Sequence, residues 1–204
     1  MVAFIRNLQT RTILNIPLIL QNSNILLEIL RISHFDVNLV FVGKGFIKSL
    51  NLRYRRRNIT TDILAFPYLE FPKPGRLPKE PLKPHEHTLG DIILGTPKIL
   101  EDCKSDGVEL DGYLPVIITH GLCHLLGYTH DTQQNLDKMR GKEIEVLTEF
   151  NCRTGFNTVP ITPEKLNLYR IPDPDKKKKQ PVPASPVEED FNDFDMENQL
   201  FKDK

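Results

Sequence analysis

Three histidines within eleven residues constrain this chain more than any other feature of its sequence. They are His120, His124 and His130, in the segment HGLCHLLGYTH. Side chains four residues apart lie on one face of an α-helix, so His120 and His124 can direct their imidazoles toward a single point. Gly127 can adopt the left-handed backbone conformation that ends a helix. The pattern predicts a helix over residues 114–126, followed by a turn that brings His130 back to the other two histidines.

Three convergent imidazoles are a ligand set typical of a catalytic zinc ion. Structural zinc sites have four protein ligands, whereas catalytic sites have three and leave one position open. Zinc lowers the pKa of a bound water to about 7, which makes hydroxide available at neutral pH. We predict one Zn²⁺ per chain, bound by His120, His124 and His130, and we count His124 among the catalytic residues.

The histidine spacing also matches the extended zinc-protease motif HExxHxxGxxH, with one departure. Residue 121 is glycine, where a metalloprotease has the glutamate that acts as general base. The site can still bind zinc and activate water, but peptide hydrolysis lacks its proton carrier. A metalloprotease is therefore the less favoured alternative.

The segments around the motif predict an α+β domain. Alternating apolar residues predict strands at 3–8, 35–41, 62–66 and 89–94. Apolar residues at helical spacing predict helices at 23–32, 46–54 and 132–149, the last with Leu136, Met139, Ile144 and Leu147 facing inward. Thr96-Pro97 predicts another helix start, with Thr96 as the N-cap. Few strands, with helices between and after them, indicate a small mixed sheet with packed helices.

The composition changes near residue 158. Beyond this point the chain contains seven prolines, a run of four lysines at 176–179 and an acidic stretch from Glu188. Such a segment buries too little apolar surface to offset the entropy of ordering it. We predict a folded domain over residues 1–157 and a disordered tail over residues 158–204.

Composition and charge exclude several protein classes. No apolar run approaches the roughly 18 residues that a membrane-spanning helix requires, so we expect no membrane association. Lys+Arg and Asp+Glu both number 27, and any attraction to nucleic acid must therefore be local. The three cysteines show no CxxC spacing, which suits a reducing compartment.

Three blocks of sequence resemble the YbeY family of rRNA-maturation endoribonucleases. Residues 120–130 resemble the signature HGxxHxxG[YF]xH, residues 50–55 and 61–67 resemble LNxxYR…T[DN]VLSFP, and residues 89–92 resemble LGDI. The blocks occur in family order, and the resemblance covers roughly residues 1–155. It implies a zincin-like fold, a single zinc and cleavage of single-stranded RNA during maturation and quality control of small-subunit rRNA, with ribosomal proteins as further partners.

Arg55 matches the arginine that the family uses at its active site. A guanidinium binds a phosphate through two parallel hydrogen bonds and stabilises the charge that develops on it. We therefore predict Arg55 as a catalytic residue, with Arg53, Arg56 and Arg57 adding local positive charge. The attacking group is either zinc-activated water or the substrate's 2′-OH. A non-catalytic ribosome assembly factor with a structural zinc is the main alternative.

Two further features bear on the site and on location. Asp91 either orients a ligand histidine, contacts substrate, or lies on the polar face of a strand. Thr129 stands where bacterial members of the family have Asp, and the long loop 72–88 and the tail resemble a eukaryotic member. We expect a mitochondrial location, with the cytoplasm as the alternative.

Overall fold

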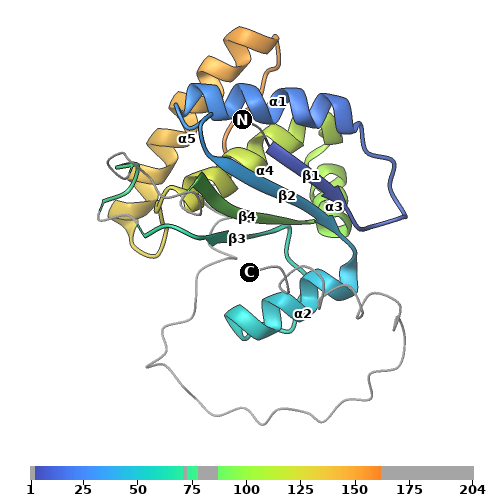
Figure 1. The fold of residues 1–204 in the computed structure, drawn as a ribbon. Helices are drawn as coiled ribbons and strands as arrows, with labels where there is room; N and C mark the ends of the chain where they lie inside the picture. The colour runs from blue at the N-terminus through green and yellow to red at the C-terminus, as the bar shows by residue number, and fades with distance from the viewer. Residues whose placement is uncertain (1–2, 71–72, 78–86, 162–204) are drawn as a thin grey trace.

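A computed structural model describes residues 3–70, 73–77 and 87–161 (Figure 1). Within them, a four-stranded sheet is formed by β1 (Ala3–Asn7), β2 (Asp36–Val42), β3 (Ile63–Pro67) and β4 (Thr88–Gly95). The strand order is β1-β2-β4-β3. The first three strands in this order are parallel, and β3 runs antiparallel to β4 at the edge. The predicted strands and the small mixed sheet are confirmed.

Helices cover both faces of this sheet (Figure 1). The described residues form α1 (Ile16–Ile29), α2 (Lys44–Arg55), α3 (Thr96–Asp106), α4 (Leu110–Leu125) and α5 (Gln133–Thr154). Successive side chains of a strand point to opposite faces, so each buried strand supplies two cores. Val40 and Ile93 pack in the cluster that includes residues of α2, whereas Leu39 and Ile92 pack in the larger cluster that includes residues of α1, α4 and α5.

Several helices start earlier than predicted, α4 at Leu110 rather than at residue 114, and two starts have a clear local reason. α1 begins at Ile16, seven residues before the predicted start, because the Asn15 side chain accepts a hydrogen bond from the Leu18 N–H and caps the helix. Thr96 as the N-cap of α3 is wrong, because Gly95 occupies that position. A Cβ at Gly95 would collide with the Thr61 carbonyl oxygen, so the chain turns from β4 into α3 where only glycine fits.

The described chain packs on the domain as far as Ile161, four residues beyond the predicted boundary. The Asn151 side chain donates to the Thr158 carbonyl at 2.9 Å and accepts from the Thr158 N–H at 3.0 Å and from its hydroxyl at 2.8 Å. Ile161 is buried in the larger core. The predicted tail from residue 162 onward lies outside the described residues. Among the described helices, none has both the length and the apolar character needed to cross a membrane.

Candidate metal centre

α4 carries the first two histidines, and a glycine turn delivers the third. The helix ends at Leu125, after which Gly127 adopts a φ of 82°. The Gly127 N–H donates to the His124 carbonyl at 3.0 Å, and the Tyr128 N–H donates to the Cys123 carbonyl at 3.0 Å. This left-handed turn reverses the chain, as the sequence predicts, and places His130 beside the other two rings.

The three imidazoles are close enough to share one ion. The Nε2 atoms of His120 and His124 lie 3.1 Å apart, and one ring nitrogen from each histidine lies within 4.8 Å of the other two. Zinc–nitrogen distances of about 2.0–2.1 Å at tetrahedral angles correspond to nitrogens about 3.3 Å apart. His120, His124 and His130 can therefore hold a metal ion.

Burial keeps these rings neutral. It lowers the pKa of His120 to about 3, and a proton on His130 or the charge of Arg55 lowers that pKa further. Burial, followed by the charges of the other two histidines, holds the pKa of His124 well below its usual value, and burial also lowers the pKa of His130. A metal ligand must be deprotonated, so the metal-free site presents its lone pairs at neutral pH without displacing protons.

The second nitrogen of each α4 ring is fixed by an oxygen atom. His124 Nδ1 donates to the Tyr128 carbonyl at 3.0 Å. His120 Nδ1 lies 2.7 Å from Glu143 Oε1. A proton on Nδ1 in these contacts leaves Nε2 unprotonated and oriented toward the metal position.

Glu143 is a functional residue that the sequence analysis missed. It lies on α5, its side chain is 3% exposed, and its Oε2 is buried without a hydrogen-bond partner among the described residues. Burial raises its pKa to about 7, although His130 and Arg140 oppose that rise. A signal was present in the sequence, because Glu143 lies four residues from each of two buried residues, Met139 and Leu147. The prediction that Ile144 faces inward is wrong, since its side chain is 47% exposed.

The structure brings Arg55 to the histidines. Arg55 is the last residue of α2 and is half-buried. It lines a small pocket shared with His120, His124, His130, Asp62, Ile63, Ala65 and Ile161. Arg53 and Arg56 are exposed and do not line this pocket. Of the four predicted arginines, Arg55 is the one that lines the pocket together with the three histidines.

Asp91 does not contact a ligand histidine. Its carboxylate accepts hydrogen bonds from Asn38 Nδ2, at 2.7 Å, and from the Tyr68 hydroxyl. Burial raises the pKa of this carboxyl, and the Asn38 hydrogen bond opposes that rise. The structure supports the polar position on a strand, and Glu143 takes the orienting contact to His120 instead. A contact between Asp91 and substrate stays a prediction.

Gly121 has a steric role. A Cβ at this position would lie 2.7 Å from Ile63 Cδ1 and 3.0 Å from Ile92 Cδ1. Glycine therefore allows α4 to approach β3 and β4 closely enough to hold the histidines beside the sheet edge. A larger side chain at this position would have to displace the ends of the Ile63 and Ile92 side chains.

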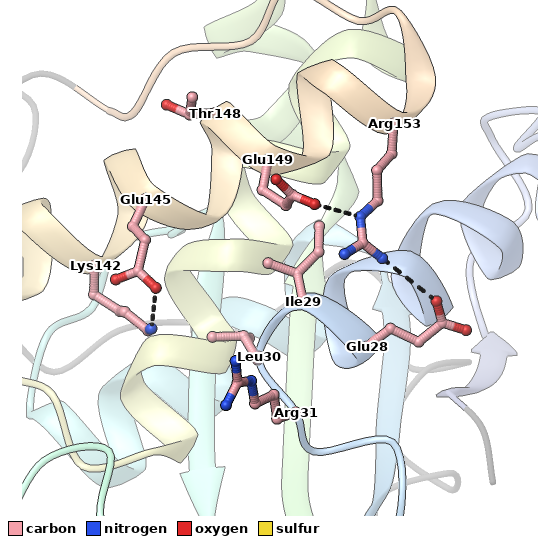
Figure 2. A pocket seen from close by; sticks show the side chains of 9 residues that line it. All are labelled: Glu28, Ile29, Leu30, Arg31, Lys142, Glu145, Thr148, Glu149 and Arg153. Atoms are coloured by element: carbon pink, nitrogen blue, oxygen red, sulfur yellow. Dashed lines mark hydrogen bonds and ion pairs between the residues drawn. The ribbon is translucent and has the colours of Figure 1, made fainter.

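A larger hollow lies away from the histidines, between the end of α1 and α5 (Figure 2). Its charges are largely paired: Lys142 contacts Glu145 at 2.8 Å, and Arg153 contacts Glu149 at 2.8 Å and Glu28 at 3.8 Å. No histidine or cysteine is among the described residues that line it. Size alone therefore does not identify the functional site of this chain.

Most of this chain is similar in sequence to known proteins. Residues 9–151 match the model of the family described as Endoribonuclease YbeY. The chain belongs to the YbeY endoribonuclease family. Human Endoribonuclease YbeY is 39% identical over 158 residues, covering 78% of this chain and 93% of that protein. Endoribonuclease YbeY of Clostridium tetani is 33% identical over 131 residues, covering 59% of this chain and 78% of that protein.

A solved structure is more distant. The solution structure of a Thermotoga maritima protein aligns with 78% of this chain and with 99% of its own chain, at 23% sequence identity. The TM-score is 0.45, and a value this low gives no information on the fold. The stretch that matches the YbeY family includes the three histidines, Arg55 and Glu143. Ile161 also lines the pocket, but it lies outside the residues that match the family model.

Proposed function

We propose that this chain is a zinc-dependent endoribonuclease that cleaves single-stranded RNA during maturation and quality control of small-subunit rRNA. One observation carries the proposal: three neutral imidazoles and an arginine converge in one pocket, in a chain of an endoribonuclease family. The helix-borne histidine pair, with a third histidine behind a glycine turn, supports a zincin-like description of the fold.

The donor set fits zinc. His120, His124 and His130 would hold the ion, and imidazole nitrogen is a preferred zinc ligand. Zinc with three protein ligands supplies a Lewis acid at its open position and lowers the pKa of a coordinated water to about 7. Among the described residues, no further histidine, cysteine or carboxylate joins the cluster, which favours a catalytic site over a structural zinc in an assembly factor.

The protein's own groups orient the site and stabilise the phosphate. Glu143 and the Tyr128 carbonyl keep the Nδ1 protons of His120 and His124 away from the metal position. Arg55 presents a planar cation that binds two phosphate oxygens and stabilises the negative charge that accumulates during cleavage. Half-burial strengthens this interaction, because the surrounding dielectric is lower than that of water. The attacking group in this proposal is water or the substrate's 2′-OH.

The proposed partners are single-stranded RNA, small-subunit rRNA and ribosomal proteins, and the proposed location is the mitochondrion, with the cytoplasm as the alternative. Support for a eukaryotic type of protein comes from the human relative, which is 39% identical over 158 residues. The metalloprotease alternative is disfavoured because residue 121 is glycine and supplies no carboxylate to act as general base.

The proposal is tested by comparing wild type with His124→Ala on single-stranded RNA and on casein, with chelator treatment and zinc add-back. His34→Ala is the matched control, because His34 is exposed and lies outside the pocket. We expect wild type and His34→Ala to cleave RNA, to lose activity with chelator and to regain it with zinc. His124→Ala should stay inactive after add-back. Cleavage of casein but not RNA would refute the proposal, and so would RNA cleavage by His124→Ala at the wild-type rate.

A further inference from the structure

An exposed tyrosine near the end of α2 packs against a partly buried phenylalanine of β3. Tyr54 is 50% exposed, and its ring packs edge-on against Phe66 of β3, with the ring centroids 4.9 Å apart. The Arg53 guanidinium lies over the Tyr54 ring, 5.8 Å from its centroid. We call these three residues the aromatic rim.

The aromatic rim borders the histidine pocket. Arg55 directly follows Tyr54, Ala65 directly precedes Phe66, and both Arg55 and Ala65 line the pocket. Ala65 packs against the core on the α4 side of the sheet, whereas Phe66 packs against the core on the α2 side. Because β3 is the edge strand, a ligand with one group at Arg55 can pass over this edge and reach the Tyr54 ring.

The charge around the aromatic rim favours a polyanion. Residues 44–61 contain two lysines and four arginines and no acidic residue, although the whole chain has no net charge. A half-exposed aromatic ring among arginines is typical of surfaces on which unpaired bases stack while the cations bind the phosphates. This combination favours single-stranded RNA over a protein partner as the occupant.

We propose that the aromatic rim is a stacking site for an unpaired nucleobase of the RNA substrate, next to the nucleotide whose phosphate binds Arg55. The identity of the substrate rests on the proposed function. An unpaired base can present its face to the Tyr54 ring, whereas the faces of duplex bases are covered by their neighbours. The aromatic rim thereby favours single-stranded over double-stranded RNA. The histidines and Arg55 alone would not, because they act on the metal and the phosphate, and both kinds of RNA have phosphates.

The test measures the affinity of the zinc-loaded full chain for a short single-stranded RNA by fluorescence anisotropy. Tyr54→Ala should weaken Kd by about tenfold, whereas Tyr54→Phe and Tyr54→Trp should keep it within about twofold because they retain a ring. Phe4→Ala is the matched control: Phe4 is 46% exposed, on the opposite edge strand β1, and its substitution should leave Kd unchanged.

An abasic RNA with the same phosphates separates stacking from charge. Wild type and Tyr54→Ala should bind it equally. The stacking site would be overturned if wild type and Tyr54→Ala bound the base-bearing RNA with equal affinity. It would also be overturned if Tyr54→Ala lost the same affinity for the abasic RNA as for the base-bearing RNA. A Tyr54→Ala effect confined to binding of a ribosomal protein would identify a protein contact and overturn it as well. Wild type that binds RNA through Tyr54 without cleaving it would refute the proposed function alone.

Discussion

Replacing Glu143 by glutamine isolates the charge of the carboxylate that holds a metal ligand. Glu143 Oε1 lies 2.7 Å from His120 Nδ1, and both side chains are almost completely buried. Glutamine keeps the size of the side chain and a carbonyl oxygen for the Nδ1 proton, but it removes the negative charge. Loss of such an orienting partner typically weakens metal affinity by about 10- to 100-fold. We expect that loss in zinc affinity for Glu143→Gln.

The same substitution changes how the stability of the metal-free protein depends on pH. Burial raises the pKa of Glu143 from 4.5 to about 7. The folded state therefore binds more protons than the unfolded state between these values, and the free energy of unfolding falls as the pH rises through this window. The fall attributable to Glu143 is on the order of a few kcal/mol, at about 1.4 kcal/mol for each tenfold change in acid constant. Glu143→Gln should lack this component.

Two measurements check the prediction. Competition with a chromophoric chelator gives the zinc affinity, and urea denaturation of the metal-free proteins across pH 4 to 8 gives the free energy of unfolding. Glu145→Gln is the matched control, because Glu145 is an exposed carboxylate on the same helix, paired with Lys142. If Glu143→Gln kept both the zinc affinity and the pH dependence of wild type, the role of the Glu143 charge would be refuted.

Three further predictions follow from the pocket and its walls. Arg55→Ala should retain zinc but lose single-stranded RNA cleavage by about 10²-fold or more, with Arg55→Lys recovering part of it; cleavage at the wild-type rate with zinc in place would contradict the phosphate role. Gly121→Glu should lower the thermal midpoint and gain no casein cleavage, because the side chain would enter the packed space beside Ile63; a stable, peptidase-active variant would be incompatible with the packing. A chain ending after Ile161 should keep wild-type stability, whereas one ending at Asn157 should be less stable in urea; equal urea midpoints would show that residues 158–161 contribute nothing.

The helices and strands that could be predicted are those whose sequence pattern lies within the element itself. The alternation along each strand and the four-residue spacing of His120 and His124 depend only on the geometry of one strand or helix. The apolar residues of α1 from residue 23 onward predict only its second half, whereas its start depends on the Asn15 cap and on Pro17 in the first turn. Thr96 was misassigned as a cap because the close approach of Gly95 to the Thr61 carbonyl is a tertiary constraint.

The site was predictable where its residues belong to short motifs. His120, His124, His130 and Arg55 lie in such motifs, and the structure brings them together. Glu143 was missed because its partner lies 23 residues earlier on another helix. Ile161 was missed because it lies in a Pro-rich segment, and its burial depends on how Thr158 bonds to Asn151.

The central claim is that one zinc ion, held by His120, His124 and His130, is required for RNA cleavage. Its most direct test is the single-turnover cleavage rate of single-stranded RNA, measured while zinc is returned stepwise to metal-free protein. We expect no cleavage by the metal-free protein, a linear rise in rate with added zinc, and a plateau at about one ion per chain. Cleavage by the metal-free protein at the full rate, or a rate that does not respond to zinc, would contradict the claim.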